Sequence, residues 1–176
     1  MKNNKLKKIK REFIVIFTIG FIYFLIESLF RGLRNWPSLI ANASLWMIIV
    51  GCFSGQLLSL INRCNFIRKN FNAFSQNILG MIGITSIEFL SGVIFSSFGL
   101  KIWGYSHLKY DWLAQVSGGH VSFTFMFFWF LLSPLGYFLF DYLSWLYFRE
   151  GNKYSLLKVY SQLFKFWIKP NIQEKR

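Results

Sequence analysis

The sequence predicts an all-α integral membrane protein: a bundle of about four transmembrane helices followed by a C-terminal amphipathic helix at the membrane surface. Of the 176 residues, 54% are hydrophobic and 21% are aromatic. The apolar residues gather in long runs that contain almost no charge. A helix needs about 20 residues to cross roughly 30 Å of hydrocarbon, which is close to the length of each run.

Four apolar runs are the candidate spans, and they cover residues 13–30, 39–61, 78–100 and 121–148. Glu27 and Glu88 are the charged residues within them, apart from Asp141 near the inner end of the last run. Polar links with turn-forming residues separate the runs. Pro134 interrupts the last run, which is therefore either one kinked helix or two short segments.

The distribution of positive charge predicts the orientation. Segments 1–12, 62–77 and 149–176 hold 6, 3 and 7 Lys or Arg residues, and segments 31–38 and 101–120 hold 2 each. Because basic segments stay on the cytoplasmic side, we expect a multi-pass protein of the cell membrane with both termini in the cytoplasm. The domain plan is a basic N-terminus (1–12), a membrane domain (13–148) and a basic tail (149–176).

The tail after Gly151 has the pattern of an amphipathic helix. Its apolar residues recur at helical spacing: Leu156, Leu157, Tyr160, Leu163, Phe164, Trp167 and Ile168. The expected partner is the bilayer with its anionic headgroups, and the alternative is a membrane or cytoplasmic protein. The net charge of +13 lies between and outside the apolar runs, so we expect no binding of nucleic acid.

No motif for a cofactor or metal is present. The sequence lacks a GxxxxGK[ST] phosphate loop, an HExxH zinc motif, a GxSxG nucleophile elbow and a glycine-rich dinucleotide turn. Cys52 and Cys64 have no CxxC spacing and no neighbouring histidine. We therefore expect no cofactor and no metal site, and we assign no catalytic residue.

Glu88 is the sharpest functional candidate, because a carboxylate near the bilayer centre usually faces protein or water. On a helix it shares a face with small or apolar residues: Gly80, Ile84, Gly92 and Ser96. Small residues let helices approach closely, so this face is expected to point into the bundle. Gly51 and Gly55 form a GxxxG pair, which also indicates a helix contact.

Glu27 lies one turn before Arg31, a spacing that lets the two side chains meet. Either a local ion pair at the headgroups or a functional pair fits this pattern. Trp103 and Tyr105 suit an aromatic belt, and His120 is either an interfacial residue or a proton relay.

Three short stretches resemble the ABC-transporter type IV membrane-protein family. They are Glu27-Ser28-Leu29-Phe30-Arg31, Glu88-Phe89-Leu90-Ser91-Gly92 and Trp103-Gly104-Tyr105-Ser106. Gly118 or Gly119 fits the glycine that opens the last hydrophobic segment of the family, whereas Gly104 stands where the family has Asp. The resemblance implies a multispan bundle around two intramembrane glutamates with an outer aromatic cap, and it adds Ser106 to the candidate residues.

These observations favour transport of a cation, a proton or a small polar solute along a path that involves Glu88 and Glu27. The alternatives are a scaffold or subunit of a larger membrane complex and an enzyme that acts on a lipid-linked substrate.

Overall fold

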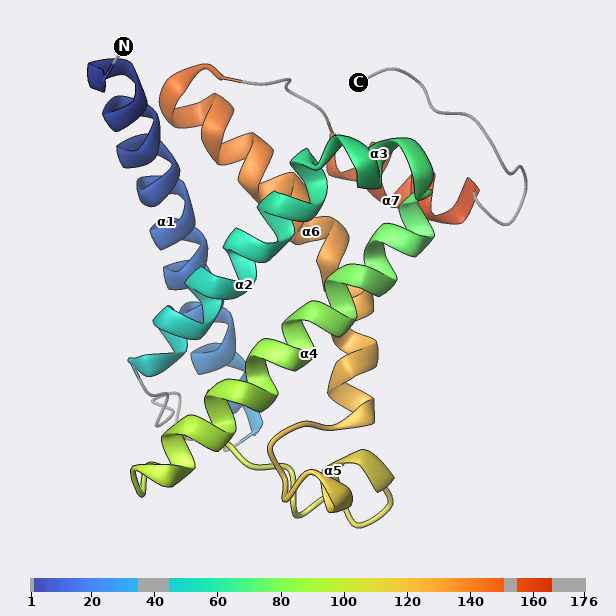
Figure 1. Ribbon diagram of the computed structural model, residues 1–176. Helices are drawn as coiled ribbons and strands as arrows, with labels where there is room; N and C mark the ends of the chain where they lie inside the picture. Colours follow the sequence, from blue (N-terminus) through green and yellow to red (C-terminus); the bar gives the residue numbers. More distant parts are fainter. Residues whose placement is uncertain (1, 35–44, 151–154, 166–176) are drawn as a thin grey trace.

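The computed structural model describes residues 2–34, 45–150 and 155–165 of the chain. Every regular element in these ranges is an α-helix, which confirms the predicted all-α class. The elements are α1 (Lys2–Arg34), α2 (Trp46–Arg63), α3 (Asn65–Asn70), α4 (Ala73–Ser97), α5 (Trp112–Val116), α6 (Phe123–Phe148) and α7 (Leu156–Lys165) (Figure 1).

Three helical stretches are long and apolar enough to cross a membrane: Ile9–Leu29, Ala73–Ser97 and Phe123–Phe148. The protein is therefore a multispan membrane protein. The second predicted span begins at residue 39, but residues 39–44 lie outside the described ranges, and the described helix α2 has 18 residues. A fourth crossing by α2, which contacts α1, α4 and α6, thus remains a prediction.

Helix ends follow local capping rather than hydropathy. The Asn72 side chain accepts a hydrogen bond from the Ser75 amide (2.8 Å), so α4 begins before the apolar run that predicted it. Gly99, with φ of +73°, ends α4 before the predicted limit at residue 100. Ser122 caps the start of α6, and Arg149 ends that helix in the left-handed conformation.

The region around Pro134 forms one continuous helix, α6, rather than two short segments. Proline has no amide hydrogen, so the helix loses one internal hydrogen bond there. The carbonyls on either side of the one freed, that of Phe130, accept additional hydrogen bonds from side chains. The Ser133 hydroxyl donates to the Trp129 carbonyl (2.7 Å), and the Tyr160 hydroxyl of α7 donates to the Leu131 carbonyl (2.9 Å). Helix α7 therefore docks on α6 beside its proline.

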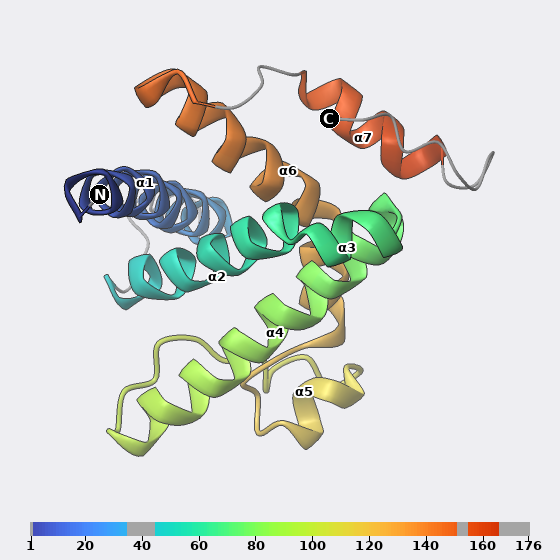
Figure 2. The same cartoon turned by 45° about the horizontal axis from the view of Figure 1, so that its top comes forward.

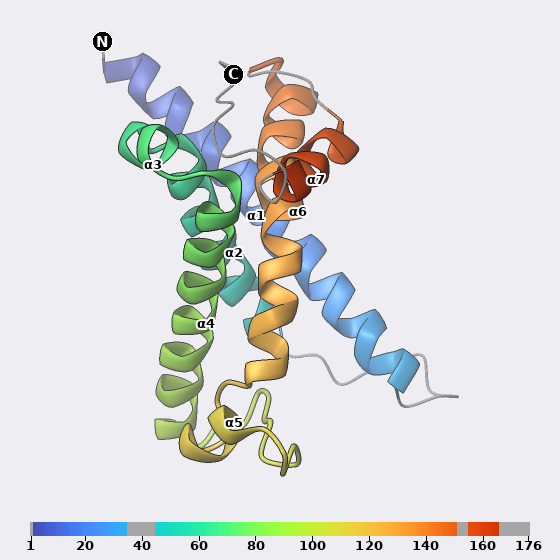
Figure 3. The same cartoon turned by 90° about the vertical axis from the view of Figure 1, so that its right-hand side faces the viewer.

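The described parts of the segments that charge predicts to share one side of the membrane lie at one end of the bundle. The start of α1, helix α3 and the end of α6 lie together, whereas α5 and the loop between α4 and α6 lie at the opposite end (Figures 1 and 3). That loop carries only Lys101 and Lys109 as basic residues. The structure thus agrees with the grouping of the segments, while the compartment that each end faces stays a prediction.

Polar contacts join three helices at the end of the bundle opposite the loop between α4 and α6, which is named the basic end below. Arg11 pairs with Glu150, and Arg63 pairs with Glu12 at 2.6 Å. The Asn62 amide of α2 donates to the Asp141 carboxylate of α6 at 3.1 Å. The first contact joins α1 to the residues after α6, and the other two fix the end of α2 between α1 and α6.

The crossing of α1 and α2 depends on glycine, which confirms the GxxxG contact (Figure 2). A Cβ atom on Gly51 would lie 2.9 Å from Tyr23 Cβ, and one on Gly55 would lie 2.9 Å from Ile19 Cγ2. The backbones can approach closely only because these side chains are absent.

The tail helix α7 packs on α6 and α4 through its buried residue Val159. Leu157, which the sequence places on the apolar face of the tail, is 81% exposed. The predicted apolar residues Trp167 and Ile168 lie outside the described residues.

Candidate functional site

Glu88 lies on the inner face of α4, as its helical period predicts. Glu88 is 4% exposed, and four other residues of the same helix are buried: Asn77, Gly80, Ile84 and Gly92. The indole nitrogen of Trp129 on α6 donates a hydrogen bond to Glu88 Oε2 at 2.9 Å. This is the side-chain hydrogen bond that Glu88 makes within the described part of the chain.

Glycines on both sides of Glu88 admit polar groups from α6 and its preceding loop. A Cβ atom on Gly80 would lie 2.7 Å from Ser133 Oγ, and one on Gly92 would lie 2.9 Å from His120 Nδ1. These glycines therefore let Ser133 pack on α4 two turns before Glu88 and let His120 pack one turn after it. Ser96, predicted on the same face, is exposed and lines the cavity described below.

Two contacts position Trp129. Its ring stacks on Tyr23 of α1 with 5.5 Å between ring centroids, and its carbonyl accepts a hydrogen bond from Ser133 beside Pro134. Trp129 of α6 thus links Tyr23 of α1 to Glu88 of α4. Trp129 was not singled out from the sequence. The signal for it is that an indole N–H inside a membrane span needs a hydrogen-bond acceptor.

Glu27 lies on α1 one turn after Tyr23 and is half-buried. It is near enough to Glu88 for the charges of the two carboxyl groups to interact. Like charges destabilise one another, so the loss of either charge relieves the repulsion. The side chain of Arg31, the predicted partner of Glu27, lies outside the described residues.

The remaining sequence candidates meet in the loop between α4 and α6. The Trp103 indole donates to the His120 carbonyl (2.9 Å), and the Tyr105 amide donates to the Gly119 carbonyl (2.9 Å). Ser106 covers Gly119 so closely that a Cβ atom there would lie 2.1 Å from Ser106 Oγ. Residues 98–122 are named the cap below.

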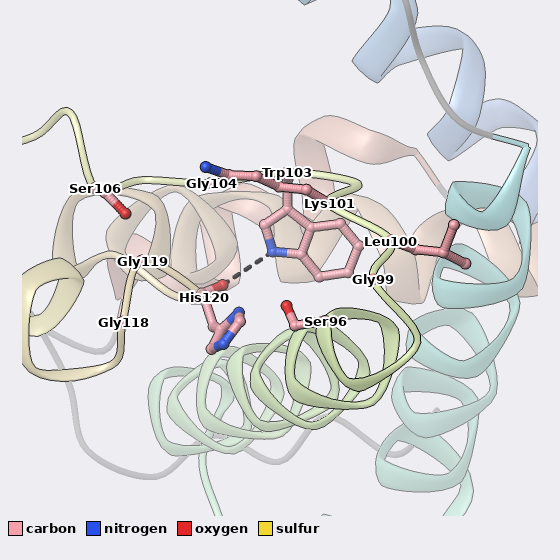
Figure 4. A pocket seen from close by; sticks show the side chains of 10 residues that line it. All are labelled: Ser96, Gly99, Leu100, Lys101, Trp103, Gly104, Ser106, Gly118, Gly119 and His120. Atoms are coloured by element: carbon pink, nitrogen blue, oxygen red, sulfur yellow. Dashed lines mark hydrogen bonds between the residues drawn. The ribbon is translucent and has the colours of Figure 1, made fainter.

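A cavity of about 260 Å³ lies between the cap and the end of α4. Figure 4 shows the Ser96 hydroxyl and the His120 ring on one side, with the Trp103 ring and the Lys101 chain across from them. The complete lining is Ser96, Gly99, Leu100, Lys101, Trp103, Gly104, Ser106, Gly118, Gly119 and His120. Gly92 and Glu88 follow Ser96 inward at intervals of one helical turn.

Asp111 holds the cap together and was not singled out from the sequence. Its buried carboxylate accepts hydrogen bonds from five groups: the amides of Ala114, Phe123 and Thr124 and the hydroxyls of Ser122 and Thr124. Burial alone disfavours its charge, but these hydrogen bonds outweigh burial and hold the pKa of Asp111 well below its usual range. The signal in the sequence was an Asp just before the short helix α5, at the N-cap position.

Within the described ranges, no group of three or more His, Cys, Asp or Glu residues could hold a metal ion. Comparisons of the chain with models of known families, with curated proteins and with solved structures find no match. The resemblance to the ABC-transporter type IV family therefore stays a prediction.

Proposed function

We propose that the protein is a transporter or a permease-like component that moves a cation, a proton or a small polar solute past Glu88 and Glu27. The observation that carries this proposal is the buried Glu88 carboxylate, which receives a single hydrogen bond from Trp129 within the described chain. Intramembrane carboxyl groups are costly to bury and typically mark ion pathways.

The surroundings of Glu88 differ on its two sides, which supports a path that opens toward the cap. Toward the cap lie Gly92, His120 and then Ser96 at the cavity, about 12 Å from Glu88 along the helix axis. On the other side, a buried apolar cluster closes the bundle: Leu58, Ile61, Ile84 and Tyr137. Alternating access requires one such closed side at a time.

A buried polar atom without a partner lies near the same carboxylate. Thr85 Oγ1, one turn from Glu88 on α4, has no hydrogen-bond partner in the described part of the chain. Buried polar atoms are normally hydrogen-bonded, so such an atom is suited to contact water or a passing solute.

The proposal includes an orientation. We place the protein in the cell membrane with the cap outside and with α3 and both termini in the cytoplasm, where basic residues meet anionic headgroups. The support is the excess of basic residues at the end opposite the cap.

The test is flux in proteoliposomes that contain the purified protein as the sole protein. Charge movement is recorded on a solid-supported membrane after jumps in pH, Na⁺ or K⁺ and after pulses of a panel of small polar solutes. We expect a current or solute uptake in the parent that Glu88→Gln abolishes. Glu150→Gln, the same substitution at an exposed residue of the basic end, should retain it.

The variants also distinguish the alternative functions. Trp129→Phe keeps the aromatic ring but removes the hydrogen bond to Glu88, so it should reduce the flux without unfolding the bundle. Absence of flux in the parent, together with a stable protein partner at purification, would favour the scaffold. Unaided turnover of a lipid-linked substrate would favour the enzyme.

A further inference from the structure

The cavity under the cap is lined by polar side chains whose polar atoms have no partner in the described chain. In the described ranges, the hydroxyls of Ser96 and Ser106, the ammonium group of Lys101 and the imidazole of His120 have no hydrogen-bond or ion-pair partner. They come from the end of α4, from the first part of the cap and from its last residues (Figure 4). Ser96, Lys101 and Ser106 are exposed and line one cavity with His120, so a ligand in the cavity can reach their polar atoms.

The electrostatic character of the cavity points to an anion. Lys101 is the charged residue of the lining, and the lining contains no carboxylate. Asp111 is the acidic residue of the cap, and its five hydrogen bonds to Ala114, Ser122, Phe123 and Thr124 already occupy it. The cavity thus holds one positive charge without a compensating negative charge.

The donor set suits a phosphate group. Lys binds phosphate as a point charge, and the two serine hydroxyls and the imidazole can each donate to a further oxygen. A volume of about 260 Å³ accepts a small phosphate ester but not a large organic ligand.

We propose that this cavity binds a phosphate group, carried either by a small soluble ester or by a phospholipid headgroup. Both sources offer the same chemistry to Lys101, Ser96 and Ser106. The end of the bundle that carries Trp103 suits the headgroup level, because Trp prefers this interface. Binding here does not require transport past Glu88.

The test uses the full-length protein in detergent, freed of phospholipid, with sn-glycerol 3-phosphate as the soluble probe and glycerol as its uncharged counterpart. Affinity is measured by isothermal titration calorimetry. We expect glycerol 3-phosphate to bind and glycerol not to bind. Lys101→Gln should weaken binding at least about tenfold, because it removes a charge-assisted hydrogen bond.

Lys109→Gln is the matched control, since it removes the same charge from an exposed cap residue outside the lining. It should bind glycerol 3-phosphate as the parent does. Circular dichroism of both variants confirms that they keep the helical fold.

A second titration, with dihexanoylphosphatidylglycerol below its micelle concentration, identifies the source of the phosphate. Tighter binding of this lipid, with the same loss in Lys101→Gln, assigns the cavity to a headgroup. Tighter binding of glycerol 3-phosphate assigns it to a soluble ester. The proposal is overturned if neither probe binds the parent, or if Lys109→Gln weakens binding as much as Lys101→Gln.

Discussion

Replacing Asp111 by Ala should open the cap without unfolding the spans. The substitution removes the acceptor of three backbone amides, those of Ala114, Phe123 and Thr124. Each buried donor left without a partner costs about 1 to 3 kcal/mol. The Ala114 hydrogen bond is buried and the other two are part-buried, so the cap should lose about 3 kcal/mol of local stability.

Asp111→Asn should be milder, because its side-chain oxygen can still accept from Ala114 and Phe123. The new amide group then faces Ser122 and Thr124. Their hydroxyls can rotate to accept from it, and the Thr124 amide is left without an acceptor. One lost acceptor corresponds to about 1 to 3 kcal/mol.

Hydrogen exchange followed by mass spectrometry measures this local stability in detergent or nanodiscs. A loss of about 3 kcal/mol corresponds to roughly 100-fold faster exchange, so peptides over residues 111–124 should exchange that much faster in Asp111→Ala. Peptides of α2 should not change. Asp141→Asn makes the same chemical change as Asp111→Asn, but at the basic end, and it should leave the cap unaffected. Unchanged exchange over residues 111–124 in Asp111→Ala would refute the reasoning.

The same carboxylate predicts a pH dependence. Because the native pKa of Asp111 lies well below the value of about 3.9 in an unfolded chain, its contribution is fully present above that value. It is lost only as the pH falls further, through the native pKa. Cap exchange in the parent, corrected for intrinsic rates, should therefore stay constant from about pH 8 to pH 5. A loss of protection near neutral pH would contradict the assignment.

Three further predictions concern other parts of the bundle. Tyr160→Phe should loosen α7 by about 0.5 to 1.5 kcal/mol, because it removes the hydrogen bond to the α6 backbone, and protease cleavage of the tail measures this. Cleavage at the parental rate would contradict this contact. Gly92→Val should push His120 away and lower the free energy of unfolding by about 1 to 3 kcal/mol. An unchanged melting temperature would show that α4 and the end of the cap are not in contact. A membrane-impermeant thiol reagent added to intact cells should label Ser106→Cys but not the exposed Cys64, and the reverse pattern would invert the proposed orientation.

The sequence predicted those features that follow from the membrane and from helical geometry. Long uncharged runs indicated the spans, because lipid must solvate them. The period of α4, with glycines on either side of Glu88, indicated the buried face, since an intramembrane carboxylate and close helix contacts favour the same side. The charge of the links indicated which segments share one end of the bundle.

Features that depend on distant segments could not be predicted in this way. The partner of Glu88 is Trp129, and this pairing depends on how α4 and α6 cross and on the axial register between them. Asp111 looks like an ordinary N-cap in the sequence, and its second role arises only because the chain returns to it at Ser122. Hydropathy also failed to predict where the helices end, because helix propagation and capping residues decide these positions. For example, α1 continues through the basic segment that precedes residue 13.

We propose that Glu88 faces a path that water and solute enter from the cap. The most direct test is the reactivity of Glu88→Cys, in a Cys52→Ser, Cys64→Ser background, toward a small charged methanethiosulfonate reagent in proteoliposomes. Leu90→Cys, at a residue 59% exposed on the outer side of α4, reports the lipid-facing surface, and Ser96→Cys reports the cavity. We expect modification of Ser96→Cys and Glu88→Cys and none of Leu90→Cys. Modification of Ser96→Cys alone, with Glu88→Cys as inert as Leu90→Cys, would show that no such path reaches Glu88.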